Sequence, residues 1–319
     1  MFNVDQVSSS GHDAYSHHET KARESLGKVV KNGDKHIPPS ALNARAILRR
    51  YGIRPNPRLG QNFLIDSGAL AKVVAAAELT GDETVLEVGA GLGALTRRLA
   101  SEARQVIAVE FDRRLFPILE QMVSNLENVQ LIAGDILSLD LETLIGEQPY
   151  RVVANIPYNI TSILIRRLME SPRPAERVVL TVQREVAQRI VAKPGAMNLL
   201  AISVQLYGEP HVVARIPARA FYPKPKVDSA VLRVDIHPEP RVSRLLIPQL
   251  FRLARAGFNQ KRKQLRNSLA GGLCVAPAQI DVWLEEAALR PRSRAQELSL
   301  EAWAGLAQVV MESEGVSQG

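Results

Sequence analysis

Strand-like and helix-like segments alternate along the middle of this chain, from residue 84 to residue 191. Short apolar runs have the length and composition of buried strands, and amphipathic segments separate them. We predict strands at residues 84–88, 105–109, 129–133, 152–154 and 177–182, and helices at residues 92–100, 113–124, 160–169 and 185–191. Because parallel strands need long crossovers, this alternation predicts a doubly wound, mostly parallel α/β sheet.

The segments on either side of this alternation differ from it. Residues 1–39 are polar and end in Pro38-Pro39, which predicts a disordered N-terminal extension. Helices are expected at residues 41–51, capped by Ser40, and at residues 67–78, while two later apolar runs, 211–215 and 230–235, predict a hairpin at the sheet edge. Residues 242–319 show helical signals only, at residues 244–257, 261–269, 277–288 and 300–311. We therefore predict an α/β domain at residues 40–241 and a small all-α domain at residues 242–319.

Charge and cysteine content narrow the class of protein. The net charge of +7 over 319 residues favours an anionic partner such as nucleic acid. The single cysteine, Cys274, excludes an intramolecular disulfide and argues against a cysteine-based metal cluster, and we expect no metal. No apolar run approaches the roughly 18 residues that a membrane helix needs, and the N-terminus has no secretory pattern. A cytoplasmic protein without a membrane partner is expected.

A glycine-rich loop follows the strand predicted at residues 84–88. Gly89 and Gly91 allow a close approach of the backbone to a ligand, although a tight strand-to-helix turn also needs glycine. Glu110 ends the next strand, where a carboxylate can accept hydrogen bonds from ribose hydroxyls. Asp135 follows the third strand and can accept from an adenine amine. The loop departs from the Gly-x-Gly-x-x-Gly pattern of nicotinamide enzymes and is similar to the first motif of S-adenosylmethionine-dependent methyltransferases.

A second motif, Asn155-Ile156-Pro157-Tyr158, follows the strand predicted at residues 152–154. Ligands of open α/β sheets bind beyond the carboxyl ends of strands, so this motif and the glycine loop can share one crevice. The Asn155 side-chain oxygen and the Pro157 carbonyl suit the two N–H groups of an adenine amine, and Tyr158 suits stacking on the base. Orienting the amine in this way would lower the activation barrier by part of the ~7–11 kcal/mol that ideal positioning of reactants can supply. A proline turn with a buried tyrosine is the structural alternative.

The chain resembles the KsgA/RsmA family of ribosomal RNA adenine N6-dimethyltransferases from about residue 40 to residue 311. The matching blocks are LGQNFLID (59–66), VLEVGAGLGALT (85–96), NIPYNIT (155–161), VQREVAQR (182–189), FYPKPKVDS (221–229) and FNQKRKQLRNSL (258–269). Ile156 stands where leucine is common in that family.

The resemblance implies a seven-stranded Rossmann-like methyltransferase sheet followed by a helical RNA-binding domain. It also implies transfer of methyl groups from S-adenosylmethionine to the N6 atoms of two adjacent adenosines in the 3′-terminal hairpin of 16S rRNA, during maturation of the small ribosomal subunit. The expected partner is therefore 16S rRNA in the immature subunit, and the expected oligomeric state is a monomer.

The resemblance also implies roles for single residues. The target base is held by Asn155, Pro157 and Tyr158, and Phe221 packs on its other face. The cofactor is bound by Gln61, Asn62, Leu64, Gly89, Gly91, Glu110, Asp135 and Asn155.

A basic stretch, residues 252–266, contains no acidic residue. On a helix it would present a basic face for RNA phosphates, or simply a solvated face. The RNA-binding candidates are Lys224, Lys226, Lys261, Arg262, Lys263 and Arg266.

Two other functions stay open at this point. One is a 23S rRNA adenine methyltransferase of the macrolide-resistance type, which shares the glycine loop and the NxPY-type motif. The other is a ribosome-assembly or nucleic-acid-binding factor without catalysis, against which the intact motifs argue.

Overall fold

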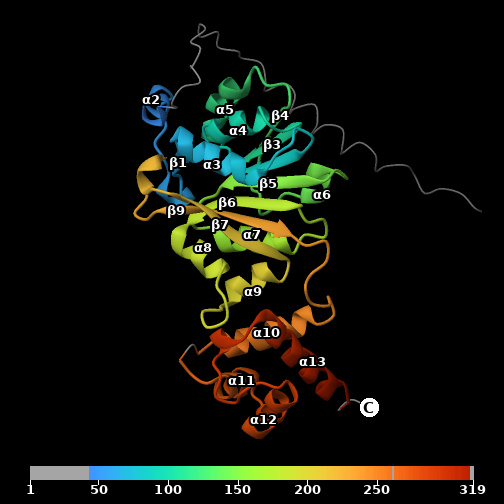
Figure 1. Cartoon of the computed structure of the whole chain (residues 1–319). Helices are drawn as coiled ribbons and strands as arrows, with labels where there is room; N and C mark the ends of the chain where they lie inside the picture. Colours follow the sequence, from blue (N-terminus) through green and yellow to red (C-terminus); the bar gives the residue numbers. More distant parts are fainter. Residues whose placement is uncertain (1–42, 261, 317–319) are drawn as a thin grey trace, which may run out of the picture. The chain divides into compact units, whose positions relative to one another are not determined.

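Seven strands form one mixed sheet in the order β4-β3-β2-β5-β6-β9-β7 (Figure 1). The computed structural model describes residues 43–260 and 262–316. The strands are β2 (Thr84–Val88), β3 (Gln105–Glu110), β4 (Val129–Ala133), β5 (Tyr150–Asn155), β6 (Arg177–Gln183), β7 (Gly208–Ile216) and β9 (Ser229–Ile236). The strands from β2 to β6 are mutually parallel, whereas β9 is antiparallel to both of its neighbours. The chain builds outward from β2 on one side and then from β5 on the other, so the topological switch point lies between these two strands.

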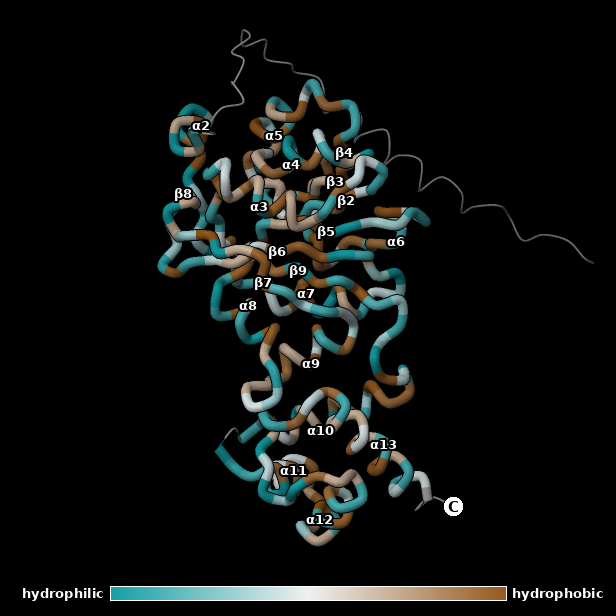
Figure 2. The backbone as a smooth tube through the Cα atoms, viewed as in Figure 1, coloured by the Kyte–Doolittle hydropathy of each residue, from teal (hydrophilic) through white to brown (hydrophobic). Residues whose placement is uncertain are grey.

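Helices cover both faces of the sheet. On one face lie α3 (Ser67–Ala77), α4 (Ala94–Ala100) and α5 (Phe116–Val123), and on the other lie α7 (Thr161–Met169), α8 (Arg184–Ile190) and α9 (Leu199–Gln205) (Figure 1). A short helix, α6 (Leu141–Ile145), precedes β5. Every residue of β2 is buried, as expected for a strand with helices on both sides. Figure 2 shows the same pattern as brown, apolar residues along the central strands.

The predicted doubly wound sheet and its edge hairpin of β7 and β9 are confirmed. One predicted helix, residues 113–124, is instead a 3-10 turn, η3 (Arg113–Leu115), followed by α5. Pro117 explains this break, because proline lacks the N–H that a continuous helix needs and fits only in a first turn. The short helices α6 and α9 were not predicted. No helix among residues 43–260 and 262–316 is long and apolar enough to cross a membrane.

A short N-terminal segment precedes the sheet. Helix α2 (Ala44–Arg50) begins after Asn43, whose side chain accepts a hydrogen bond from the Ala46 N–H. The predicted extension, residues 1–39, and the predicted cap Ser40 lie outside the described residues. A 3-10 turn, η2 (Pro57–Leu59), then leads into β1 (Phe63–Leu64), which pairs with β8 (Phe221–Tyr222) in a separate two-stranded sheet.

The C-terminal region is helical, as predicted. It contains α10 (Ile247–Phe258), α11 (Leu265–Leu273), α12 (Pro277–Glu286), a 3-10 turn η5 (Ala295–Glu297) and α13 (Leu300–Val316). These helices pack around Trp303, and their core also takes in Ala201 and Ile202 of α9. The division into domains at residue 242 therefore stays a prediction.

Candidate functional site

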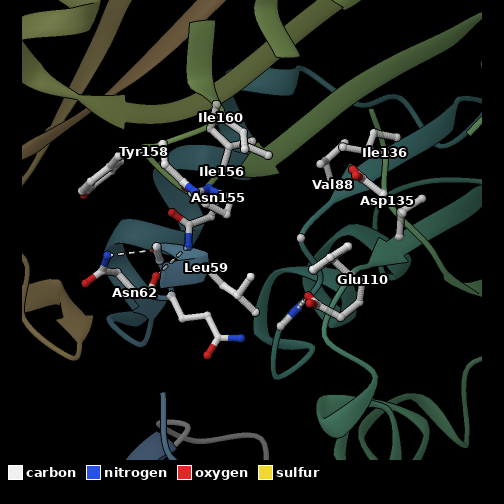
Figure 3. Close-up of a pocket in the computed structure, with 18 of the residues that line it drawn as sticks. Leu59, Asn62, Val88, Glu110, Asp135, Ile136, Asn155, Ile156, Tyr158 and Ile160 are labelled. Carbon is white, nitrogen blue, oxygen red and sulfur yellow. Dashed lines mark hydrogen bonds between the residues drawn. The ribbon is translucent and has the colours of Figure 1, made fainter. Parts of the chain in front are cut away.

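A cavity of about 260 Å³ opens at the carboxyl ends of the parallel strands, at the switch point of the sheet (Figure 3). The structure brings most of the predicted site residues to its wall. These are Gln61, Asn62, Gly89, Gly91, Glu110, Asp135, Asn155, Pro157 and Tyr158. They come from the segment before β1, the ends of β2, β3, β4 and β5, and the loop after β5.

The glycine loop and Glu110 form one hydrogen-bonded unit. The Gly91 N–H donates to Glu110 Oε2 at 2.8 Å, and the Asp112 N–H donates to Glu110 Oε1 at 2.7 Å. Gly91 has φ +59°, which favours glycine, and a Cβ there would make a tight contact of 3.1 Å with the Phe63 ring. Burial raises the pKa of Glu110, while the two N–H donors oppose that rise. The backbone thus holds this carboxylate rigidly at the cavity wall.

The cavity is acidic. Its described lining contains the carboxylates of Glu110 and Asp135 and no lysine, arginine or histidine. Two carboxylates and no basic side chain make this wall favour a cationic ligand over an anionic one. It suits S-adenosylmethionine, which carries a sulfonium and an ammonium group. The residues present therefore fit this cofactor better than a nicotinamide dinucleotide.

The Asn155 amide is oriented by a backbone carbonyl from a distant part of the chain. Its Nδ2 donates to the Asn62 carbonyl at 3.0 Å, and Asn62 Nδ2 in turn donates to the Gly60 carbonyl at 3.1 Å (Figure 3). Because Nδ2 is engaged, the amide oxygen Oδ1 is assigned as the free acceptor, and no group in residues 43–260 or 262–316 donates to it.

The neighbouring residues of the motif are also anchored. The Pro157 carbonyl accepts from the Ile160 N–H at 3.2 Å and from the Thr161 hydroxyl at 3.4 Å. The Tyr158 hydroxyl lies 2.7 Å from the hydroxyl of Ser229, a fully buried residue at the start of β9. Burial raises the pKa of Tyr158, so its hydroxyl is neutral. The hydrogen bond to Ser229 fixes the hydroxyl end of the ring.

Two predicted residues do not reach the cavity. Phe221 is only 3% exposed and pairs with Leu64 in the β1–β8 sheet, and neither side chain lines the cavity. In this conformation the Phe221 ring therefore cannot stack on a base in the cavity in the way that was predicted. Leu64 instead borders a small void that Gly89 and Gly91 also line.

The basic face that residues 252–266 would present on a single helix does not form. Helix α10 ends at Phe258 and α11 begins at Leu265, so Arg262 and Lys263 lie between two helices. Arg266 forms a bidentate ion pair with Asp281. Four other RNA-binding candidates are exposed, namely Lys224, Lys226, Arg262 and Lys263. Lys261 lies outside the described residues.

Three features of the cavity were missed by the sequence reasoning. Phe111, directly after Glu110, lines the cavity and is 56% exposed. Gln61 donates to Asp112 Oδ2 at 2.8 Å and accepts from the Asn56 N–H at 2.7 Å, which fastens the segment before β1 to the end of β3. Arg114 and Gln61 hold the pKa of Asp112 below its usual value. An aromatic residue after a strand-terminal acid is the one local signal that was available.

Comparisons with known proteins place this chain among rRNA methyltransferases. The family model described as "Ribosomal RNA adenine dimethylase" matches residues 52–310. Two similar proteins are both named "Ribosomal RNA small subunit methyltransferase A". The one from Dehalococcoides mccartyi (strain CBDB1) is 43% identical over 267 residues, covering 83% of this chain and 92% of that protein. The one from Lachnoclostridium phytofermentans is 40% identical over 275 residues, covering 83% and 95%.

Solved structures agree on the fold. The 23S rRNA methyltransferase ErmE is 28% identical, with a TM-score of 0.63 over 78% of this chain and 100% of that one. A dimethyladenosine transferase from Plasmodium falciparum is 24% identical, with a TM-score of 0.67 over 79% and 98%.

Proposed function

The chain belongs to the ribosomal RNA adenine dimethylase family and is an S-adenosylmethionine-dependent rRNA adenine dimethyltransferase, and from this premise we propose that its substrate is the small-subunit rRNA. We assign as targets the N6 atoms of two adjacent adenosines in the 3′-terminal hairpin of 16S rRNA. Relatives named as small-subunit methyltransferases are about 40% identical to it, compared with 28% for the 23S enzyme, which supports this choice.

The observation that carries the proposed chemistry is a cation-free, acidic cavity with one oriented amide acceptor at its wall. Gly89, Gly91, Glu110 and Asp135 would hold the cofactor, with Glu110 accepting from its ribose hydroxyls and Asp135 from its adenine. Gln61 and Asn62 would cover it, and Leu64 would support that cover. S-adenosylmethionine supplies an electrophilic methyl group when bound.

Asn155 and Pro157 would orient the target amine. The lone pair of an adenine amine is delocalised into the ring, so the amine becomes nucleophilic only when two acceptors draw its N–H groups out of the ring plane. Asn155 Oδ1 is free for one N–H group. The Pro157 carbonyl can accept from the second N–H group once its longer hydrogen bond, which the Thr161 hydroxyl donates at 3.4 Å, is broken. No strong base is needed, because the proton leaves after the nitrogen has become cationic.

Tyr158 would stack on the flipped base, a contact worth roughly 1–3 kcal/mol. A base in a hairpin loop is partly unstacked already, which lowers the cost of flipping it. We assign Phe221 to the opposite face of the base, a role that requires its loop to move out of the β1–β8 sheet. The proposal includes a monomer that acts in the cytoplasm on immature small subunits.

Methyl transfer from labelled cofactor to purified, unmodified small and large ribosomal subunits tests the substrate. We expect label in the small subunit only, recovered as N6,N6-dimethyladenosine near the 3′ end of its rRNA. The Asn155→Ala variant should lose this transfer, whereas Glu102→Gln, a change at an exposed residue of the turn after α4, should keep it. Label confined to the large subunit would contradict the proposal.

A further inference from the structure

Five exposed arginines, to which no role has been given so far, lie on α2 and on the segment that leads from it to the cavity. This α2 arginine cluster consists of Arg45, Arg49, Arg50, Arg54 and Arg58. None of the five forms an ion pair with any other residue that the structure describes. Arg166, Arg215 and Arg244, which are also exposed, each have a carboxylate partner.

The cluster carries an electrostatic cost, and no described carboxylate forms an ion pair with it. The sequence has no aspartate or glutamate between residue 43 and residue 65. Arg45 and Arg49 stand four residues apart on one helix face, where like charges destabilise a helix by a few tenths of a kcal/mol (about 0.2–0.5). The opposite face of α2 is satisfied, because Ala44, Ile47 and Leu48 are buried. The arginine face is therefore the part of this helix that still lacks a partner.

The side chains present suit phosphate groups. All five cations are arginines, whose planar guanidinium groups bind phosphate oxygens in a bidentate way. The Arg50 guanidinium carbon lies 5.9 Å from the centroid of the Tyr51 ring, and the Tyr51 hydroxyl donates to Gln121 of α5. This stacking fixes part of the cluster against the body of the protein, so less side-chain entropy is lost when a ligand binds.

The cluster continues to the loop that carries the acceptor motif. Asn159 Nδ2 donates to the Arg58 carbonyl at 3.4 Å. At Gly60, which has φ +63°, a Cβ would lie 2.8 Å from Asn159 Oδ1 and 3.1 Å from Pro157 Cβ, so the two segments are in close contact. Leu59 lines the cavity beside Asn62 (Figure 3). The last member of the cluster thus lies at the rim of the site.

We propose that the α2 arginine cluster binds the phosphodiester backbone of the substrate RNA next to the adenosine that enters the cavity. This inference rests on the proposed function, since it assigns a second contact surface to the same substrate. Contacts to phosphates fix the position of a nucleic acid without reading its bases. The cluster therefore sets how the strand approaches Asn155, while the motif itself recognises the amine.

The triple variant Arg45→Gln, Arg49→Gln, Arg50→Gln tests the proposal, because glutamine keeps the helix propensity and removes three charges. Binding and methylation of unmodified small subunits are measured between about 0.05 and 0.3 M salt. Loss of three phosphate contacts should lower the slope of log K against log salt by about 2–3 and weaken binding roughly ten- to a hundredfold at low salt. KM for the subunit should rise, whereas kcat and the Kd for the cofactor should not change. The corresponding triple lysine variant should restore the salt slope.

A matched control removes the same total charge elsewhere. Arg166, Arg215 and Arg244 are exposed, lie on separate elements, and are each paired with a carboxylate. Their replacement by glutamine should leave the slope close to that of the wild type. If both triple variants lose the same amount of salt slope and RNA affinity, the effect is one of net charge and the inference is overturned. A cluster variant with the wild-type slope and KM would also overturn it. A wild-type protein that methylates no small subunit contradicts the proposed function instead.

Discussion

Replacing Glu87 by glutamine should change how the stability of the protein depends on pH. Glu87 lies in β2 and is fully buried, and neither of its carboxylate oxygens has a hydrogen-bond partner among the described residues. Burial raises its pKa to about 8. The neighbouring Thr96 opposes this rise, and the Glu110 carboxylate adds to it. At neutral pH the folded protein therefore holds Glu87 in its protonated form.

The direction and size of the effect follow from this pKa. In the unfolded chain the carboxyl loses its proton near the ordinary value of 4.5, whereas in the folded protein it keeps the proton up to about pH 8. The contribution of Glu87 to the free energy of unfolding is therefore fully present below about pH 4.5 and is lost as the pH rises through 8. One pH unit corresponds to about 1.4 kcal/mol, so the loss over the whole interval is at most about 5 kcal/mol.

Thermal unfolding of the cofactor-free protein at pH 5 and pH 8 measures this loss. Glu87→Gln cannot ionise, so its melting temperature relative to the wild type should rise by roughly 5–10 °C between these pH values. A buried amide without partners also costs stability, but that cost is the same at both pH values. Glu102→Gln, an exposed change, should show no such rise. If Glu87→Gln and the wild type show the same pH dependence, the buried, protonated state of Glu87 is refuted.

Three further predictions concern the site and the helical region. Glu110→Ala should weaken cofactor binding roughly ten- to a hundredfold in calorimetry, because the ribose hydroxyls lose a charged acceptor; unchanged affinity would move the ribose elsewhere. Tyr158→Phe and Ser229→Ala should each lower kcat about three- to tenfold. The double variant should be no worse than either, since both changes remove the same hydrogen bond. Additive losses, or an equal loss in the buried-serine control Ser268→Ala, would contradict the positioning role of Ser229. Gly272→Ala should lower the melting temperature, because its Cβ would lie 2.7 Å from Ala256 Cβ across the α10–α11 contact and overpacking costs about 1–3 kcal/mol. A Cβ at Gly271 would meet nothing within 4 Å, so the control Gly271→Ala should stabilise the helix by up to about 1 kcal/mol. Equal shifts in melting temperature would refute this packing.

The sheet and the centre of the site could be predicted because their signals are local. Each parallel strand is an apolar run, and Gly89, Glu110, Asp135 and Asn155 each stand at the end of such a run. Knowing that neighbouring strands end at one edge of a sheet is enough to bring these residues together. The β1–β8 pair offered no such signal, since each strand has two residues and 156 residues of chain lie between the two. The family resemblance assigned Phe221 to one face of the target base, and nothing local in the sequence indicated that pairing with Leu64 buries it.

Charge was the property that the sequence could locate least well. The stretch from residue 252 to residue 266 has no acid of its own, yet Arg252 pairs with Glu314 and Arg266 with Asp281, on helices α13 and α12. Only Arg255, Arg262 and Lys263 of its described cations form no ion pair with a described residue. The partner that neutralises a cation is thus set by helix packing, which a charge run along the chain does not encode. The α2 arginines show the reverse: they are spread through a less conspicuous stretch, but packing brings no carboxylate to them. An RNA surface is therefore better identified by cations that folding leaves unpaired than by basic runs in the sequence. By that criterion the α2 cluster should contribute more to the salt dependence of RNA binding than Arg266 does.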